Sequence, residues 1–139
     1  MASTAALTEL HPDQCASLLA GARLGRLAVN LPGWPPLIRP ISFRYERDSQ
    51  SILFRCALGS KLHALSRAQR AAFEIDGEDA EGPWSVIVIG PVEEVTGAAE
   101  LARLAGSDLA PWLADGDARW LRIRAGAVSG RRVAAAHPR

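Results

Sequence analysis

The chain has 139 residues, of which 48% are hydrophobic and 22% charged, and it contains 16 basic and 15 acidic side chains. This length suits one domain with its own core, and a net charge of +1 lacks the basic excess typical of nucleic-acid binders. Without a run of roughly 18 apolar residues, a secretory signal or enough cysteines for a disulfide scaffold, the chain is predicted to be cytoplasmic and to stay out of membranes.

The predicted elements begin with a short helix. Residues 1–10 carry no capping or periodic signal and are predicted to form a flexible arm. His11, Pro12 and Asp13 then open a helix that ends near Gly21.

Six short strands account for most of the remaining pattern. The run Val86–Ile89 predicts one strand buried on both faces. Helices are predicted from near Ser60 and over 96–113, the latter broken near Gly106 or Pro111. Short spacing and few helices favour a mainly β, α+β fold built as an antiparallel barrel or sandwich. The predicted strands cover residues 24–31, 37–45, 51–57, 71–76, 84–95 and 119–128.

Acidic and basic residues occupy different parts of the sequence. Between Glu74 and Asp117 there are eleven acids and one base, Arg103, whereas six arginines and no acid follow from Arg119 onwards. Such an asymmetry is expected to pair opposite charges on neighbouring elements or between two subunits.

One short segment has the chemistry of a phosphate site. Gly59 allows close backbone approach, Ser60 adds a hydroxyl and a helix N-terminus, and Lys61, the single lysine, adds a compact charge. Arg39 and Arg44, on a neighbouring predicted strand, carry charge that can reach the same anion. The alternative is an ordinary serine N-cap followed by a solvated lysine.

Two further positions are weaker candidates. Trp84 and Ser85 begin a buried strand, where an indole and a hydroxyl can flank a planar ligand. The face of Trp120, Arg122 and Arg124 is expected to carry solvated arginines, and the alternative is an anion or subunit contact. The scattered histidines and the two cysteines predict no metal site, and no catalytic acid, base or nucleophile is assigned.

Several segments together resemble the flavin-binding split β-barrel proteins related to pyridoxamine 5′-phosphate oxidase. The resemblance lies in their order and spacing along nearly the whole chain. The segments are GRLAV (25–29), RPISF (39–43), ILFR (52–55), GSKL (59–62), AAFEIDGED (71–79), GPWSVIVIGPVEEVT (82–96) and VSGRR (128–132).

The resemblance implies a homodimer of six-stranded antiparallel split β-barrels with short flanking helices and FMN in two grooves between the subunits. The barrel would cover residues 11–132, with 133–139 as a flexible C-terminal tail. Arg55, Ser60 and Lys61 would contact the phosphate. The implied cofactor contacts are Arg39, Pro40, Ile41, Ser42, Arg55, Cys56, Ser60, Lys61, Leu62, Trp84 and Ser85.

The function that the resemblance implies is an FMN-dependent oxidoreductase acting on a small organic substrate. Cys56 stands where close relatives carry threonine, so one hydroxyl donor is expected to be lost. The chain stops soon after Arg132, without the segment that grips pyridoxamine phosphate, so oxidation of vitamin B6 is not expected. The alternatives are a flavin-carrying or flavin-sensing module without turnover and a reductase that uses the deazaflavin F420. A haem-binding barrel ranks last because no histidine is well placed as an axial ligand.

Overall fold

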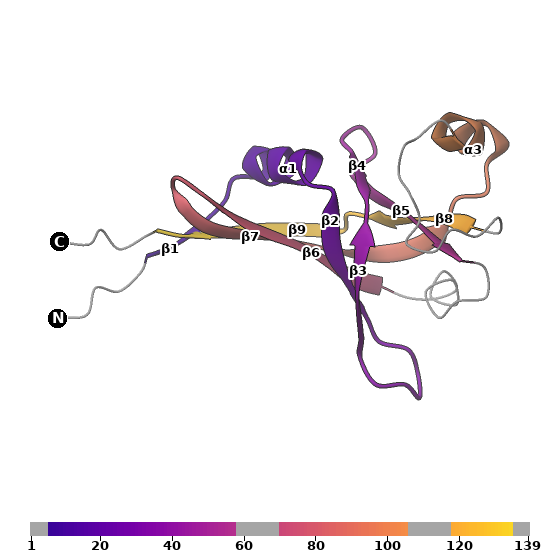
Figure 1. The fold of residues 1–139 in the computed structure, drawn as a ribbon, viewed down its shortest axis with the longest axis horizontal. Coiled ribbons are helices and arrows are strands. Elements are labelled where there is room, and N and C mark those ends of the chain that lie inside the picture. The colour runs from indigo at the N-terminus through magenta and orange to yellow at the C-terminus, as the bar shows by residue number, and fades with distance from the viewer. Residues whose placement is uncertain (1–5, 58–69, 106–117, 135–139) are drawn as a thin grey trace.

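The protein folds as an antiparallel β half-barrel flanked by two short helices (Figure 1). The computed structural model describes residues 6–57, 70–105 and 118–134. Nine strands and two helices lie in these ranges. In chain order they are β1 (Leu7–Glu9), α1 (Pro12–Gly21), β2 (Leu24–Val29), β3 (Leu37–Ser42), β4 (Arg44–Glu46), β5 (Ser51–Ala57), β6 (Arg70–Asp79), β7 (Gly82–Glu94), α3 (Ala98–Ala105), β8 (Ala118–Arg124) and β9 (Ala127–Val133).

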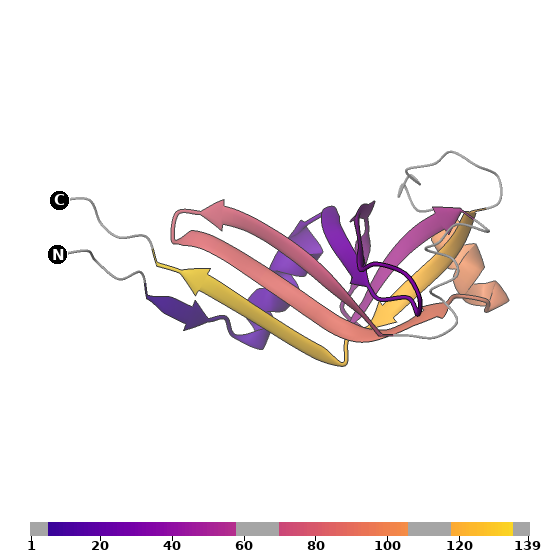
Figure 2. The same ribbon diagram turned by 90° about the horizontal axis from the view of Figure 1, so that it is seen from below.

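All pairings in the sheet are antiparallel, and β7 is the strand that joins its two parts. The main order is β3-β2-β6-β7-β8-β5-β4, while β9 pairs with β7 and β1 pairs with β9. Figure 2 shows β6, β7 and β9 as one long curved layer, with β5 and β8 at its far end. Within β7, residues 84–89 pair with β9 and residues 92–94 with β8.

The mainly β class and antiparallel barrel are confirmed, but the predicted number of six strands is wrong. The predicted strand 37–45 splits into β3 and β4, since Phe43 is not paired as a strand residue and its ring packs inward. The predicted strand 119–128 likewise divides between β8 and β9 at residues 125–126. Residues 7–9, predicted as part of an arm, form β1, because β9 offers its edge as a partner.

The helix predictions are confirmed where the structure describes them. His11 caps α1: the backbone N–H of Asp13 donates to its Nδ1 at 3.3 Å, and its own N–H donates to Gln14 Oε1 at 2.8 Å. Helix α3 ends at Ala105, next to the predicted break at Gly106. The predicted helix near Ser60 and the rest of 96–113 after Ala105 lie outside the described residues. Neither described helix has the length and apolar character that a bilayer crossing requires.

The prediction that residues 86–89 are buried on both faces is wrong for a single chain. Val86 and Val88 are fully buried, whereas Ile87 and Ile89 remain 39% and 41% exposed. Strand side chains alternate between faces, and the barrel core covers one face only.

Two apolar clusters lie on opposite sides of β5 and β8. The larger fills the barrel and includes Phe43 and Phe73, whose rings meet edge to face with centroids 4.7 Å apart. The smaller lies under α3 and consists of Leu53, Val95, Leu104 and Trp120, with Leu101 packed against it. Trp120 is therefore covered by α3 and only 7% exposed, although the sequence placed it on a face of solvated arginines.

Gly90 marks the point at which β7 changes partners. A Cβ atom there would lie 1.7 Å from the carbonyl oxygen of Arg124. The N–H of Gly126 donates to the carbonyl of Ile89 at 2.9 Å, so the link between β8 and β9 crosses β7 in direct backbone contact. Only glycine permits this approach.

Gly90→Ala is therefore expected to lower the free energy of unfolding by about 3 kcal/mol or more, because the strands must separate to admit the methyl group. Chemical denaturation checks this. The control is Gly21→Ala at the end of α1, where nothing lies within 4 Å of the added carbon. That change is expected to be neutral or to stabilise by up to about 1 kcal/mol. Equal stability of the two variants would contradict the packing argument.

Candidate functional site

The candidate residues on β3 lie on a strand with one inward and one outward face. Ile41 is buried in the barrel, whereas Arg39 and Pro40 are exposed and Ser42 is half-buried. The guanidinium of Arg39 donates only to the neighbouring carbonyl of Ile38, at 3.2 Å, within the described part of the chain. Its charge is therefore available to a ligand.

Strand β5 brings Arg55 and Cys56 to the same part of the barrel, since β3 and β5 are in contact. Cys56 points into the large core and is buried there, outside any disulfide. Arg55 faces the other side of β5 and lies opposite Trp120 of β8, with its guanidinium carbon 5.4 Å from the centre of the indole.

Arg55 differs from the other half-buried arginines of the described chain in having no acidic partner there. Its Nε–H group is buried and donates to no hydrogen-bond acceptor among the described residues. A buried donor without an acceptor is costly, and such a group is explained well by an anion that binds to it. Of the candidate site, this is the feature that fits a phosphate most directly.

Trp84 and Ser85 pair with β9 near the start of β7, whereas Arg55 pairs with β8, which meets β7 only at its other end. Glu94, which pairs with β8, lies ten positions after Trp84 on β7, and this is about 33 Å of extended strand. The indole of Trp84 packs over Gly77, where a Cβ atom would lie 2.6 Å from the ring. Within one chain the described candidate residues thus form two separate groups.

Ser60, Lys61 and Leu62 lie outside the described residues, so their predicted phosphate contacts stay predictions. Arg44, the other predicted contributor of charge, is exposed on β4 and makes no ion pair with any described residue.

The charge asymmetry of the sequence resolves into ion pairs between neighbouring elements. Arg132 on β9 donates to Asp79 at the end of β6 and to the carbonyl of Gly82 at 3.1 Å. The hydrogen bond from Arg132 holds the pKa of the Asp79 carboxyl below its ordinary value. The β6–β7 hairpin that carries Trp84 is thereby tied to β9.

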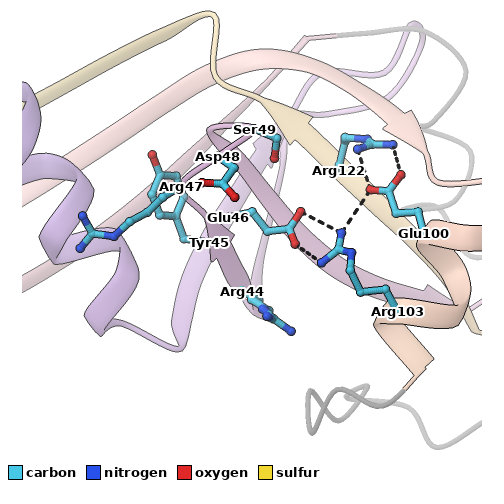
Figure 3. A pocket seen from close by; sticks show the side chains of 9 residues that line it. All are labelled: Arg44, Tyr45, Glu46, Arg47, Asp48, Ser49, Glu100, Arg103 and Arg122. Atoms are coloured by element: carbon cyan, nitrogen blue, oxygen red, sulfur yellow. Dashed lines mark hydrogen bonds and ion pairs between the residues drawn. The ribbon is translucent and has the colours of Figure 1, made fainter.

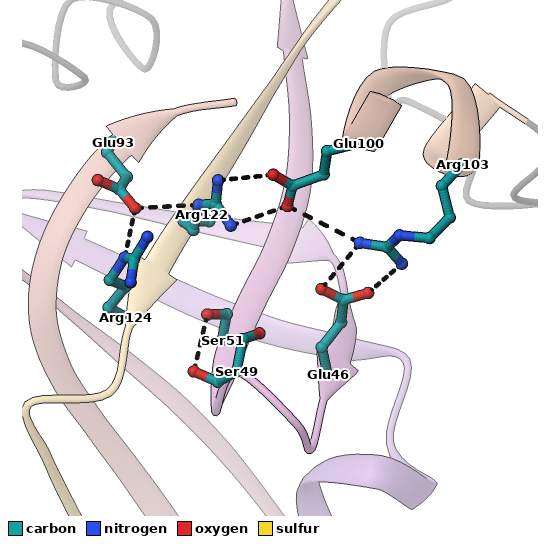
Figure 4. A network of polar contacts seen from close by, with 8 residues as sticks. All are labelled: Glu46, Ser49, Ser51, Glu93, Glu100, Arg103, Arg122 and Arg124. Atoms are coloured by element: carbon teal, nitrogen blue, oxygen red, sulfur yellow. Dashed lines mark hydrogen bonds and ion pairs between the residues drawn. The ribbon is translucent and has the colours of Figure 1, made fainter. Parts of the chain in front are cut away.

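A second set of ion pairs attaches α3 to the sheet (Figure 4). Arg122 of β8 holds Glu100 with two hydrogen bonds of 2.8 and 2.9 Å. Arg103 binds Glu46 of β4, and this hydrogen bond raises the pKa of the Arg103 guanidinium, which stays charged. On the other side, Glu93 contacts Arg122 at 3.0 Å. Helix α3 is fixed over the smaller apolar cluster as a result.

These residues also surround a cavity of about 580 Å³, lined by residues 44–49 together with Glu100, Arg103 and Arg122 (Figure 3). The sequence analysis did not single it out, since its lining residues come from β4 and the turn after it, from α3 and from β8, which are far apart in the chain. Its two arginines from α3 and β8 are already paired, and Arg44 and Arg47 point in different directions in Figure 3. The cavity therefore offers no convergent anion site.

No group of three metal-ligating side chains gathers anywhere in the residues that the structure describes. Among the described candidate residues, Ser85 forms no hydrogen bond with a side chain that could act as a base. The arrangement offers cation and aromatic contacts to a ligand, and acid–base groups do not converge on it.

Comparison with known proteins is consistent with this geometry. A family model described as pyridoxamine 5′-phosphate oxidase matches residues 11–132. No curated protein matches the sequence.

Several solved structures match over nearly their whole length. The FAD binding protein from Mycobacterium smegmatis is 33% identical, with a TM-score of 0.79 over 93% of this chain and 100% of that chain. An FAD-binding protein from Mesorhizobium loti is 25% identical, with a TM-score of 0.76 over 95% and 100% of the two chains. A conserved protein of unknown function from Corynebacterium diphtheriae is 28% identical, with a TM-score of 0.73 over 91% and 98%.

Proposed function

Because this chain belongs to the pyridoxamine 5′-phosphate oxidase family, we propose that it binds a flavin nucleotide and uses it for redox chemistry on a small organic substrate. The observation that carries the proposal is the half-buried Arg55 guanidinium, which has a buried donor and no acidic partner among the described residues. A phosphate supplies both the acceptor and the opposite charge.

The ligand chemistry is that of a riboflavin 5′-phosphate group. FMN ends in this group, and FAD contains it within a diphosphate, so both can present phosphate oxygens to Arg55. Among similar proteins, those from M. smegmatis and M. loti are described as FAD-binding. We favour FMN, whose terminal phosphate carries a charge of about −1.5 to −2 at neutral pH. Arg39 and Ser42 would lie along the ribityl chain, and Ser60 and Lys61 would complete the phosphate site.

A homodimer would bring the two groups of candidate residues together. Across the outward face of the sheet, one row of paired positions from β3 to β9 is entirely apolar. It consists of Ile38, Ala28, Ala72, Ile89 and Ala127, and its two isoleucines are well exposed. An apolar row of this kind suits burial against a second copy. We propose that this face pairs two subunits, so that Trp84 and Ser85 of one approach the Arg55 site of the other.

Redox turnover would depend on the flavin, which supplies the electron-transfer chemistry when bound. The residues of this chain would bind the phosphate, orient the ring and exclude water, since the described candidate residues include no assigned acid or base. The alternatives are a flavin carrier without turnover and a reductase that uses F420 at the same cationic site.

Flavin binding is expected to weaken ten- to a hundredfold in Arg55→Gln, because one charge-assisted phosphate contact contributes about 1.5–3 kcal/mol. Fluorescence titration with FMN, FAD, riboflavin and F420 measures this and ranks the ligands. Riboflavin, which lacks the phosphate, should bind both proteins equally. Arg47→Gln, which removes an exposed arginine from the β4–β5 turn, is the matched control and should leave every affinity unchanged. Unaltered FMN affinity in Arg55→Gln would remove the phosphate assignment.

Subunit association is expected to fail in Ile89→Lys, because a charge placed in the apolar row cannot be buried against its counterpart. Light scattering coupled to size exclusion should give a dimer for the unaltered protein and a monomer for the variant. Ala20→Lys adds the same charge to the exposed side of α1 and should leave the dimer intact. A dimeric Ile89→Lys protein would show that another face is used.

Catalysis and carriage differ in the rate of flavin reduction. Protein reconstituted with FMN is expected to lose its flavin absorbance on mixing with reduced nicotinamide, or with reduced F420, faster than free FMN does. The control is the same mixture made with protein that carries no flavin. A rate equal to that of free FMN would favour the carrier over the enzyme.

A further inference from the structure

Arg55 is held by an aromatic ring where comparable arginines of this protein are held by acids. Arg122 and Arg132 are each only 14% exposed in their side chains, and both form ion pairs, with Glu100 and Asp79 respectively. Arg55, also partly buried, has no acidic partner among the described residues and lies against Trp120 instead.

The register of the sheet makes this contact specific. Arg55 and Trp120 are directly paired positions on β5 and β8, so their side chains emerge on the same face. The guanidinium carbon lies 5.4 Å from the ring centre, within the range in which the negative face of an indole attracts a cation.

An aromatic partner and an acidic partner have different consequences for a ligand. A carboxylate occupies N–H donors of the guanidinium and cancels its charge, as Glu100 does for Arg122. A ring face attracts the cation without accepting its in-plane N–H groups and without adding a negative charge that would repel a phosphate. Arg55 thus keeps its full charge and its donors for an anion.

Trp120 is itself held rigidly. Its indole is 7% exposed within the cluster formed by Leu53, Val95 and Leu104. The N–H of Val95 donates to the carbonyl of Trp120 at 2.9 Å. The Arg122–Glu100 pair fixes α3 above this cluster (Figure 4). The ring therefore presents one fixed face to Arg55 before any ligand arrives.

We propose that Trp120 is a positioning residue, which keeps the Arg55 guanidinium oriented and free of acids so that it binds the phosphate of the ligand. This inference rests on the proposed function and deepens it. It assigns to the aromatic ring a share of the affinity for phosphorylated ligands and none of the affinity for their unphosphorylated counterparts.

The test compares FMN with riboflavin in Trp120→Leu and Trp120→Phe. Loss of the ring is expected to weaken FMN binding roughly three- to thirtyfold in Trp120→Leu, the range of a cation–π contact. Trp120→Phe keeps a weaker ring and should show a smaller loss, while riboflavin affinity should not change in either variant. Leu121→Ala, which creates a packing defect on the other face of β8 away from Arg55, is the matched control. It should lower stability without changing the ratio of the two affinities.

A purely structural role for Trp120 would lower FMN and riboflavin affinity together, and that result overturns the inference. Unchanged FMN affinity in Trp120→Leu overturns it as well.

A thermal-stability measurement with inorganic phosphate separates this inference from the proposed function. If the unaltered protein binds no flavin but is stabilised thermally by phosphate, and Trp120→Leu loses that stabilisation, the proposed function fails and the inference stands. If phosphate stabilises neither protein and no flavin binds, both fail.

Discussion

The close backbone contact at Gly90 is the constraint on which the rest of the structure depends. Because no side chain stands there, the carbonyl of Arg124 can pass directly over β7. That crossing lets one strand of 13 residues pair with β9 along its first half and with β8 at its end. The barrel half that carries Arg55 and the hairpin that carries Trp84 are consequently parts of one continuous sheet, held at a set separation.

The arginines of this sheet have two kinds of partner, acidic side chains and an aromatic ring. Arg122, Arg124 and Arg132 each form an ion pair with an acid from the acidic stretch before them. The pairs of Arg122 and Arg132 tie α3 and the β6–β7 hairpin to the sheet. Arg55 instead rests on Trp120. The ion pairs serve the fold, and their presence around α3 keeps the ring beneath Arg55 in place. The charge of Arg55 is therefore not neutralised by any described acid.

The outward face of the sheet explains why one strong sequence pattern misled. Val86–Ile89 is apolar at every position, and this is typical of strands covered on both sides. In one chain the barrel covers Val86 and Val88 and leaves Ile87 and Ile89 exposed. A pattern of burial in the sequence records every surface that becomes covered, including surfaces covered by another subunit. The proposed homodimer gives the exposed isoleucines such a cover.

The sequence alone was enough to predict the features that depend on neighbouring residues or on composition. These are the α1 cap, the alternating strands β2 and β5, the antiparallel β class and the pairing of opposite charges. The resemblance of several segments to flavin-binding split barrels also selected Arg55. Tertiary structure alone decided the breaks at Phe43 and at residues 125–126, the strand β1 and the burial of Trp120. Each of these depends on a partner distant in the chain: a core that draws a ring inward, an edge open to pairing, or a helix that covers a face. Local periodicity carries no information about such partners.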